Sequence, residues 1–212
     1  SVQALKSLVK DKKIGTAVTA SMIWAMRKPD AYFEQNWRST EGSPVMINIV
    51  HDLDLLRFIF GDIAKITGFG SSQIRNQARV ESGAAAILFE TGMTASISFA
   101  DTAPSPWGFE AGTGENPNIA TSRQDMLWIT GTQGGISFPS MTQWGGAADW
   151  SETPTPRKLK IATAVPLQQQ LQHFLDVMAG KAEPLISVFD ATKTLANTLE
   201  LETLLAQQIE PI

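Results

Sequence analysis

The segment Gly42–Gly61 places the strongest constraint on how this chain folds. Pro44 stands near its start and a glycine ends it, and the residues between are apolar almost all round, which is typical of a buried helix. Yet Asn48, His51 and Asp52 are spaced i, i+3 and i+4, so they share one face of that helix. Burying a carboxylate and an imidazole without partners is unfavourable. We therefore expect this face to meet a polar network or to open into a cleft.

The composition excludes several classes of protein. With 212 residues, 43% hydrophobic and 18% charged, the chain resembles an ordinary globular protein of one large or two small domains. A net charge of −4 and the lack of a basic run argue against a nucleic-acid partner. The sequence has neither a membrane-length apolar stretch nor a signal peptide, and without cysteine it forms no disulfide or thiolate metal site. We predict a cytoplasmic protein with no membrane partner and no metal.

Hydrophobic periodicity predicts strands in the middle of the chain and helices near its ends. Strands are expected over 14–24, 63–69, 84–89, 94–99, 126–130, 135–138 and 157–161. Helices are expected over 2–11, 44–60, 166–179 and 188–208, the last with Ser187 and Asp190 as a capping-box variant. Loops are expected over 25–43, with at most one helical turn, and over the Pro- and Gly-rich residues 101–122. This order predicts an α+β fold: an open, mainly antiparallel sheet with helices on one face.

Only His51 and His173 can exchange protons near neutral pH. His173 lies in an amphipathic pattern, so we expect a structural role for it. For His51, two interpretations stand. It is either a core histidine bound to a backbone carbonyl, which residue chemistry alone favours, or a general acid–base. In the second case Asn48 and Asp52 set its tautomer or hold a polyol substrate.

Other polar residues also leave alternatives open. Arg27, Tyr32, Trp37 and Arg38 fit either a packed loop with solvated arginines or a rim that binds a carbohydrate or an acid. The glycines of segments 105–110 and 112–117 do not form a dinucleotide fingerprint, because a third glycine is absent and no helix plainly follows. Four acidic residues near the end of the chain are expected to be solvated helix charges: Asp190, Glu200, Glu202 and Glu210.

Several motifs in order resemble one family. Residues 51–57 (HDLDLLR) match a helix motif of the glucose–fructose oxidoreductase/inositol dehydrogenase/MocA family, here the GFO/IDH/MocA family. The resemblance is to the C-terminal domain and runs from about residue 14 to the end of the chain. Supporting segments are Trp37-Arg38, Ser105-Pro106-Trp107, Gly131-Thr132-Gln133-Gly134-Gly135, and Leu171 through Ala179 followed by Pro184-Leu185.

The resemblance implies a fold like the C-terminal domain of glyceraldehyde-3-phosphate dehydrogenase, with an open sheet that often mediates oligomers. It implies an N-terminal Rossmann domain that binds NAD or NADP, and hydride transfer at a sugar, cyclitol or related polyol. Carried onto this sequence, it makes His51 the candidate catalytic acid–base. Candidate substrate contacts are Trp37, Arg38, Asn48 and Asp52. Asp54 is expected to anchor the helix.

The chain departs from the family pattern in two ways. Many members place an aspartate four residues before the histidine, where this chain has Ile47, so proton relay through such an aspartate is not expected. The chain also has neither the dinucleotide fingerprint nor the Glu-Lys-Pro motif of the Rossmann domain, and Arg27-Lys28-Pro29 does not replace it. We therefore interpret residues 1–13 as the last helix of a missing Rossmann domain or a linker, and 14–212 as the C-terminal domain.

Two functions of different classes follow. The first is the substrate-binding and oligomerisation domain of an NAD(P)-dependent oxidoreductase, which on its own binds no dinucleotide and turns over no substrate. The second is a non-catalytic carbohydrate-binding or assembly module derived from that family. Under either function, an apolar outer sheet face predicts a homo-oligomer, since such faces usually mark interfaces.

Overall fold

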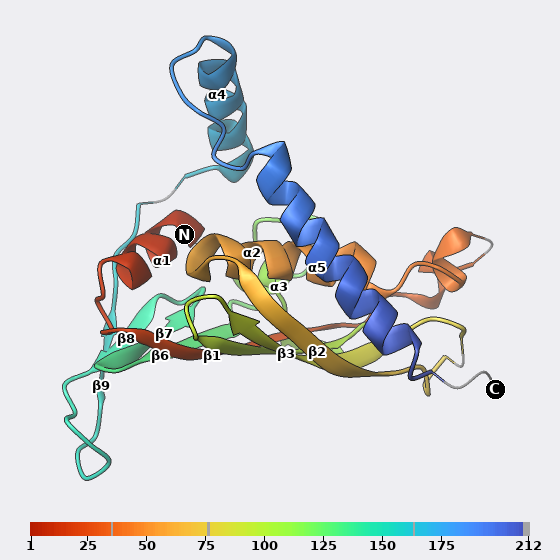
Figure 1. Cartoon of the computed structure of the whole chain (residues 1–212), viewed down its shortest axis with the longest axis horizontal. Helices are drawn as coiled ribbons and strands as arrows, with labels where there is room; N and C mark the ends of the chain where they lie inside the picture. Colours follow the sequence, from red (N-terminus) through yellow and green to blue (C-terminus); the bar gives the residue numbers. More distant parts are fainter. Residues whose placement is uncertain (35, 76, 163, 210–212) are drawn as a thin grey trace.

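The computed structural model describes residues 1–34, 36–75, 77–162 and 164–209, and it contains one sheet with helices on one side (Figure 1). The strands lie in the order β2 (Ile63–Ser71), β3 (Ser82–Phe89), β4 (Thr94–Ala100), β1 (Ala17–Met26), β6 (Leu127–Gly131), β7 (Gly134–Phe138), β8 (Thr142–Gly145) and β9 (Thr155–Lys158). β5 (Pro104–Trp107) pairs with the end of β1. Only β1 and β4 are parallel among these pairs, which confirms the predicted α+β fold with a mainly antiparallel sheet.

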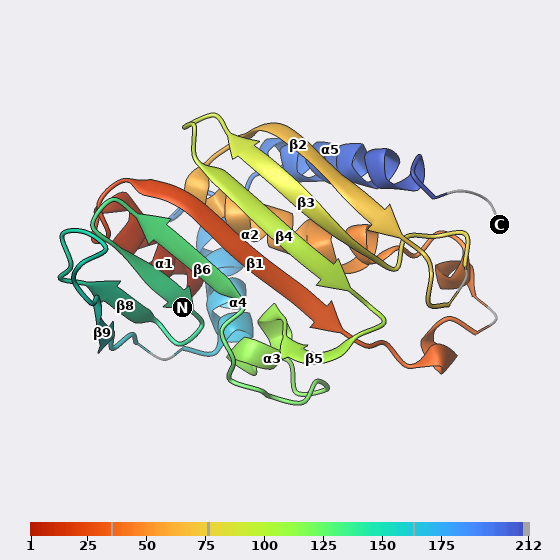
Figure 2. The same cartoon turned by 90° about the horizontal axis from the view of Figure 1, so that it is seen from below.

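Buried and exposed side chains alternate along the central strands, so the sheet has one core face and one open face. In β4 the side chains of Ala95, Ile97 and Phe99 are buried, whereas the residues between them are exposed. This is the period of two that places successive side chains on opposite sides of a sheet. Figure 2 shows the sheet from the side that carries no helix. The core therefore lies between the other face and the helices.

The helices differ in how they use that covered face (Figure 1). α1 (Val2–Lys10) packs against α2 (Val50–Phe60), and α5 (Val188–Ala206) packs against both α2 and β2. α4 (Pro166–Met178) instead stands away from the sheet, and none of its residues is buried. Its apolar stripe is at least half exposed: Leu167, Leu171, Phe174, Leu175 and Met178. No helix in the described part of the chain has both the length and the apolarity to cross a membrane.

Two sequence expectations are wrong in the middle of the chain. Residues 101–122 are not a long unstructured connection, because they contain β5 and α3 (Phe109–Thr113). Pro104 and Pro106 sit in a short strand that pairs with only the end of β1, a place where a missing N–H is tolerated. The hydrophobic pattern does not predict β8. The strand expected at 157–161 corresponds to β9, which begins earlier and ends at Lys158.

The helix predicted over 44–60 is confirmed, but its first part has a different geometry. Val45–Ile49 forms a wider π-helical turn before α2 continues as a regular helix. Gly61 ends α2 with a φ of 96°, a left-handed value that favours glycine. π-helical turns are rare and often occur at functional sites. Here the turn contains Asn48.

Arg57 joins α2 to α5 and to the start of β2. Its side chain is 2% exposed. Its Nη2 donates to Asp62 Oδ1 at 2.6 Å and to Asp190 Oδ1 at 3.0 Å, and its Nη1 donates to Thr194 Oγ1 at 2.6 Å. Ser187 Oγ accepts from the backbone N–H of Asp190, which confirms the serine half of the predicted cap. The Asp190 carboxylate turns to Arg57 instead.

The expectation of solvated acidic residues in α5 is therefore wrong for Asp190, and it is also wrong for Glu202. Ser43 donates a hydrogen bond to Glu202, and burial raises the pKa of this carboxyl although that bond opposes the shift. Both residues face neighbouring elements because α5 packs along its length on the rest of the domain. Glu200 is exposed, as expected, and Glu210 lies outside the described residues.

Replacing Arg57 should test this junction. Arg57→Ala is expected to lower the free energy of unfolding by about 1.5–3 kcal/mol, because it removes several hydrogen bonds to charged groups while the Asp62 and Asp190 carboxylates stay partly exposed to solvent. Urea unfolding measures this difference. Arg27→Ala is the matched control, since Arg27 pairs with Asp30 at an exposed site and should change stability by less than about 1 kcal/mol. Equal effects of the two substitutions would contradict the role given to Arg57.

Candidate functional site

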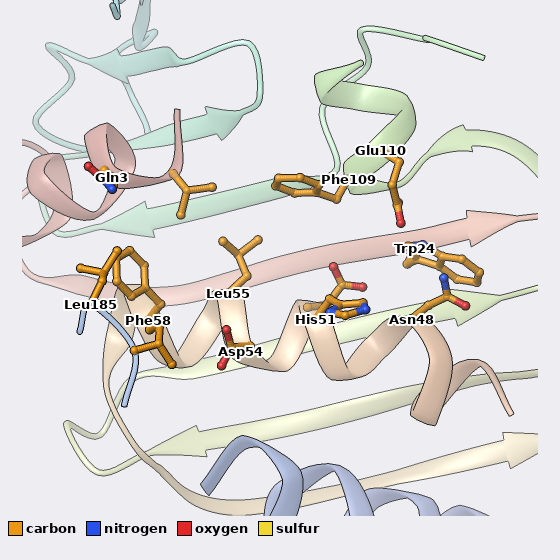
Figure 3. Close-up of a pocket in the computed structure, with 13 residues that line it drawn as sticks. Gln3, Trp24, Asn48, His51, Asp54, Leu55, Phe58, Phe109, Glu110 and Leu185 are labelled. Atoms are coloured by element: carbon orange, nitrogen blue, oxygen red, sulfur yellow. The ribbon is translucent and has the colours of Figure 1, made fainter. Parts of the chain in front are cut away.

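A cavity of about 500 Å³ lies beside α2 (Figure 3). Its wall combines segments that are far apart in sequence: α1, the end of β1, the π-helical turn with α2, α3 and the segment before α5. One end is polar and the other is largely apolar. The lining residues are Val2, Gln3, Trp24, Asn48, His51, Asp52, Asp54, Leu55, Phe58, Phe109, Glu110, Leu185 and Ile186.

The polar face of α2 opens into this cavity, as one of the two sequence alternatives predicted. Asn48, His51 and Asp52 all line it, and Figure 3 shows Asn48 and His51 on the side of α2 that faces Glu110. The interpretation of His51 as a buried core histidine is wrong, because this residue is exposed. Its imidazole is therefore accessible to a ligand. Asp54 accepts a hydrogen bond from Thr194 Oγ1 at 2.7 Å, which confirms its expected anchoring role.

Four buried polar atoms in the cavity wall have no hydrogen-bond partner within the described chain. They are Trp24 Nε1, Asn48 Oδ1, Asp52 Oδ2 and Glu110 Oε2. Folded proteins satisfy the large majority of buried polar groups, and leaving one unsatisfied costs about 1–3 kcal/mol. Several such atoms around one cavity are consistent with a ligand that supplies the missing hydrogen bonds. This cluster is the strongest indication of a binding site in the described chain.

Asp52 and Glu110 form a pair of carboxyl groups across the polar end. Asp52 is 3% exposed, and burial, together with the charge of Glu110, raises its pKa well above the ordinary value. Glu110 comes from α3 and projects toward α2 (Figure 3). Two carboxylates that share a poorly solvated site resist ionising together. The pair therefore favours a protonated Asp52 or a cationic group between the two side chains.

Trp37 and Arg38, predicted as substrate contacts, do not line the cavity. A series of cations and aromatic rings nevertheless connects them to it. Lys28 Nζ lies 5.6 Å from the ring centroid of Trp24 and 5.1 Å from that of Tyr32. The Arg38 guanidinium lies 4.7 Å from the Tyr32 centroid and 5.4 Å from the Trp37 centroid. The predicted rim is therefore a neighbouring surface and not part of the cavity wall.

The local environment of Lys28 makes its charge less favourable. Burial lowers the pKa of Lys28 to about 8, an effect that Asp101 opposes and that three nearby arginines increase. Two of these, Arg75 and Arg79, also bind Asp101, which is fully buried. Lys28 thus belongs to a cationic cluster next to the cavity.

Glu110 and Trp24 are the site residues that sequence reasoning missed. The sequence of segment 105–110 does not by itself indicate a role for Glu110, because the approach of this residue to Asp52 depends on how α3 folds back against β5. Trp24 lies in a predicted strand, where an aromatic residue is normally read as core. For both residues, the indication of a role in the site is a buried polar atom without a hydrogen-bond partner, which only the folded structure reveals.

The described residues do not provide a cradle for a dinucleotide pyrophosphate. Gly68 and Gly70 lie within β2, and Gly112 and Gly114 lie at the end of α3. Gly108 does stand between β5 and α3, but α3 has only five residues and is too short to act as the phosphate-binding helix of a dinucleotide fold. Nor do His, Asp and Glu side chains gather in groups of three or more that would hold a metal ion, within the ranges that the structure describes.

Comparison with known proteins places the domain in a family. Residues 2–137 match the model of the GFO/IDH/MocA C-terminal domain, and the chain therefore belongs to the GFO/IDH/MocA family of oxidoreductases. The search of curated proteins finds no match. Among solved structures, the chain is similar to three bacterial proteins that share its fold.

One is an oxidoreductase from Agrobacterium radiobacter, solved with NAD⁺, L-tartaric acid and magnesium. Its sequence identity to this chain is 18% and the TM-score is 0.71. The match covers 97% of this chain and 59% of the other protein. The second is an NAD-binding protein from Listeria innocua, with 16% identity, coverage of 98% and 62%, and a TM-score of 0.70. The third is the WlbA dehydrogenase from Bordetella pertussis, solved with NADH and UDP-GlcNAcA, with 17% identity, coverage of 96% and 56%, and a TM-score of 0.67. The chain thus spans about three fifths of each protein's length.

The raised pKa of Asp52 predicts a specific dependence of stability on pH. The folded protein binds this proton more tightly than the unfolded chain. Its contribution to stability is therefore full below the unfolded pKa of about 3.9 and is lost as the pH rises through the folded pKa. Asp52→Asn is expected to be more stable than the parent at pH 8 and to lose less stability between pH 5 and pH 8.

Chemical denaturation at several pH values measures this difference. Asp11→Asn is the matched control, because Asp11 is exposed at the end of α1 and its substitution should leave the pH profile unchanged. A parent profile that Asp52→Asn reproduces at every pH would show that Asp52 is not the titrating group.

Proposed function

We propose that this chain is the substrate-binding domain of an NAD(P)-dependent oxidoreductase that acts on a sugar, cyclitol or related polyol. The observation that carries the proposal is the cluster of unpartnered buried atoms beside the accessible His51. A polyol offers hydroxyl groups that both donate and accept hydrogen bonds, so it can satisfy Trp24 Nε1 and Asn48 Oδ1 at once. Partially buried polar groups of this kind fix the orientation of a small ligand.

In this proposal His51 exchanges the proton of the reacting hydroxyl. An imidazole can both accept and donate a proton, which suits a general acid–base. Asn48 and Asp52 hold the neighbouring hydroxyls, since they line the cavity on the same face of α2. Trp37 and Arg38 are assigned a more distant role, as contacts for the part of a larger substrate that extends beyond the cavity along Tyr32 and Lys28.

The similar structures support a dinucleotide cofactor for the intact protein. Two of them contain NAD⁺ or NADH, and each is longer than this chain. The described residues offer no pyrophosphate cradle, so NAD or NADP would be held by another part of the intact protein and not by this chain alone. The exposed apolar stripe of α4 provides a surface on which such a domain can pack. That residues 1–13 form the last helix of such a domain or a linker remains a prediction.

The alternative is a non-catalytic carbohydrate-binding or assembly module. It is favoured by the same lack of a dinucleotide cradle in the described residues. Under this alternative the site binds a sugar without proton transfer, and His51 has no catalytic role. Reading the complete open reading frame distinguishes the two, because only the enzyme requires a dinucleotide-binding domain in the same protein.

The decisive experiment for an enzyme uses the protein encoded by the complete reading frame. With a polyol that it oxidises, His51→Asn is expected to lower kcat by about 100- to 10,000-fold through loss of general acid–base catalysis. The control Glu115→Gln changes an exposed residue outside the cavity and should leave kcat unchanged. This chain alone serves as the negative control and should show no micromolar NADH binding by calorimetry. Unchanged kcat in His51→Asn would exclude the catalytic role.

We also propose that the open sheet face forms a homo-oligomer. Cross-strand rows on this face carry short uncharged side chains, such as Ser21 beside Ser96 and Ser96 beside Ala86. The apolar residues Val18, Leu88 and Phe69 are exposed at 50%, 40% and 79%. The face is therefore only partly apolar, but it is flat and nearly free of bulky charge, which suits close packing of two sheets.

A charge at the centre of this face should prevent such packing. We expect the parent to self-associate at tens of micromolar, and Ser96→Arg to reduce its mass in light scattering to that of a monomer, since a buried unpaired charge is unfavourable. Thr153→Arg, in the exposed β8–β9 connection, is the control that should leave the mass unchanged. A monomeric parent would rule out this interface for the chain.

A further inference from the structure

The polar end of the cavity is acidic. Asp52 and Glu110 both line it, and none of the lining residues is a lysine or an arginine. Asp54 also lines the cavity, but its carboxylate is engaged by Thr194. Two cations contact rings of the cavity wall without lining it themselves. Lys6 lies over Phe58, and Lys28 lies beside Trp24 and belongs to the separate cluster around Asp101. The two carboxyl groups therefore face the cavity without a countercharge in its wall.

The unsatisfied atoms of the cavity are mostly acceptors. Asn48 Oδ1 and Glu110 Oε2 lack a donor, whereas only the N–H of Trp24 lacks an acceptor. Asp52 Oδ2 is also unpartnered, and it becomes a third acceptor when a cation beside it favours the ionised form of this carboxyl. A ligand group with several N–H donors and no acceptor fits this imbalance better than a hydroxyl, which brings a single donor. An ammonium group has three donors and a positive charge.

Trp24 provides a second observation that is independent of the acidic pair. Its side chain is 2% exposed, it lines the cavity, and its indole N–H has no partner. A ligand oxygen that reaches this depth would give the indole N–H its missing acceptor. Phe109, from α3, also lines the cavity (Figure 3). Aromatic rings around a small cavity also favour a cation, through their negative faces.

We infer that the cavity recognises a substrate bearing a primary amine, an amino sugar or aminocyclitol, whose ammonium lies between Asp52 and Glu110. The Trp24 N–H then donates to a neighbouring hydroxyl oxygen of the same ligand, and Asn48 Oδ1 accepts from a hydroxyl. A carboxylate-bearing ligand is disfavoured, because it brings a further negative charge next to these two carboxyl groups, and neither lysine nor arginine lines the cavity. The inference rests on the proposed polyol-binding function and specifies its substrate class.

The experiment compares three related probes on this chain: D-glucosamine, D-glucose and D-glucuronate. Each is titrated at constant ionic strength while the indole N–H signal of Trp24 is followed by ¹⁵N-resolved NMR. The signal is assigned by its loss in Trp24→Phe. We expect glucosamine to bind at least about tenfold more tightly than glucose, as a single charge-assisted pair provides, and glucuronate to bind more weakly than glucose.

Two carboxylate variants test whether Asp52 and Glu110 cause the preference for glucosamine over glucose. Glu110→Gln and Asp52→Asn should each reduce the glucosamine-to-glucose affinity ratio to near one, because each removes one carboxylate while retaining its shape. The control Glu115→Gln should keep the parent ratio. Unchanged backbone spectra of the variants verify that they fold. If one carboxylate variant does not fold, the other still decides the outcome.

The outcomes separate this inference from the proposed function. Equal affinity for glucose and glucosamine, or a preference for glucuronate, would overturn the amine inference and leave a polyol site intact. A glucosamine preference that persists in Glu110→Gln and Asp52→Asn would overturn it as well. If none of the probes shifts the Trp24 signal at concentrations of tens of millimolar, both the amine inference and polyol binding by this chain are contradicted.

Discussion

The rotation of α2 about its own axis is the constraint on which the site depends, and Arg57 fixes it. A helix that is apolar almost all round can pack in several rotations with similar burial. The Arg57 guanidinium selects one rotation of α2. Its hydrogen bonds to Asp190, Thr194 and Asp62 can form in that rotation only. Asp54 adds a contact to Thr194 from the same helix. With one side of α2 held against α5, the side that carries Asn48 and His51 must face the cavity.

The cavity itself shows how a fold can maintain polar groups in an unfavourable environment. The apolar packing of α2 and the sheet provides the stability, while Asp52 and its neighbours reduce it by remaining buried without partners. Such groups persist where they serve binding or proton exchange, since burial strengthens each hydrogen bond that a ligand then supplies. The chemistry of the site is thus concentrated in a few atoms that the scaffold holds in place.

Local spacing was sufficient to predict the parts of this site that lie on a single element. Asn48, His51 and Asp52 were placed on one face because the helical period applies over five residues and needs no tertiary information. The strand pattern and the α+β class followed from periodicity in the same way. Glu110 could not be placed, because its position opposite Asp52 depends on the turn from β5 into α3. Trp37 and Arg38 were expected in the site, but the folded segment holds them beyond Tyr32, outside the cavity wall.

The position of α4 has a consequence for the cavity that follows from one hydrogen bond. His173 of α4 accepts from the backbone N–H of Leu185 at 3.0 Å, and Leu185 with Ile186 forms part of the cavity wall. A displacement of α4 therefore moves this wall with it. A domain that packs on the apolar stripe of α4 would select one position of the helix and, with it, one shape of the cavity. Interdomain docking and substrate affinity would then be thermodynamically linked, each strengthening the other to the same extent.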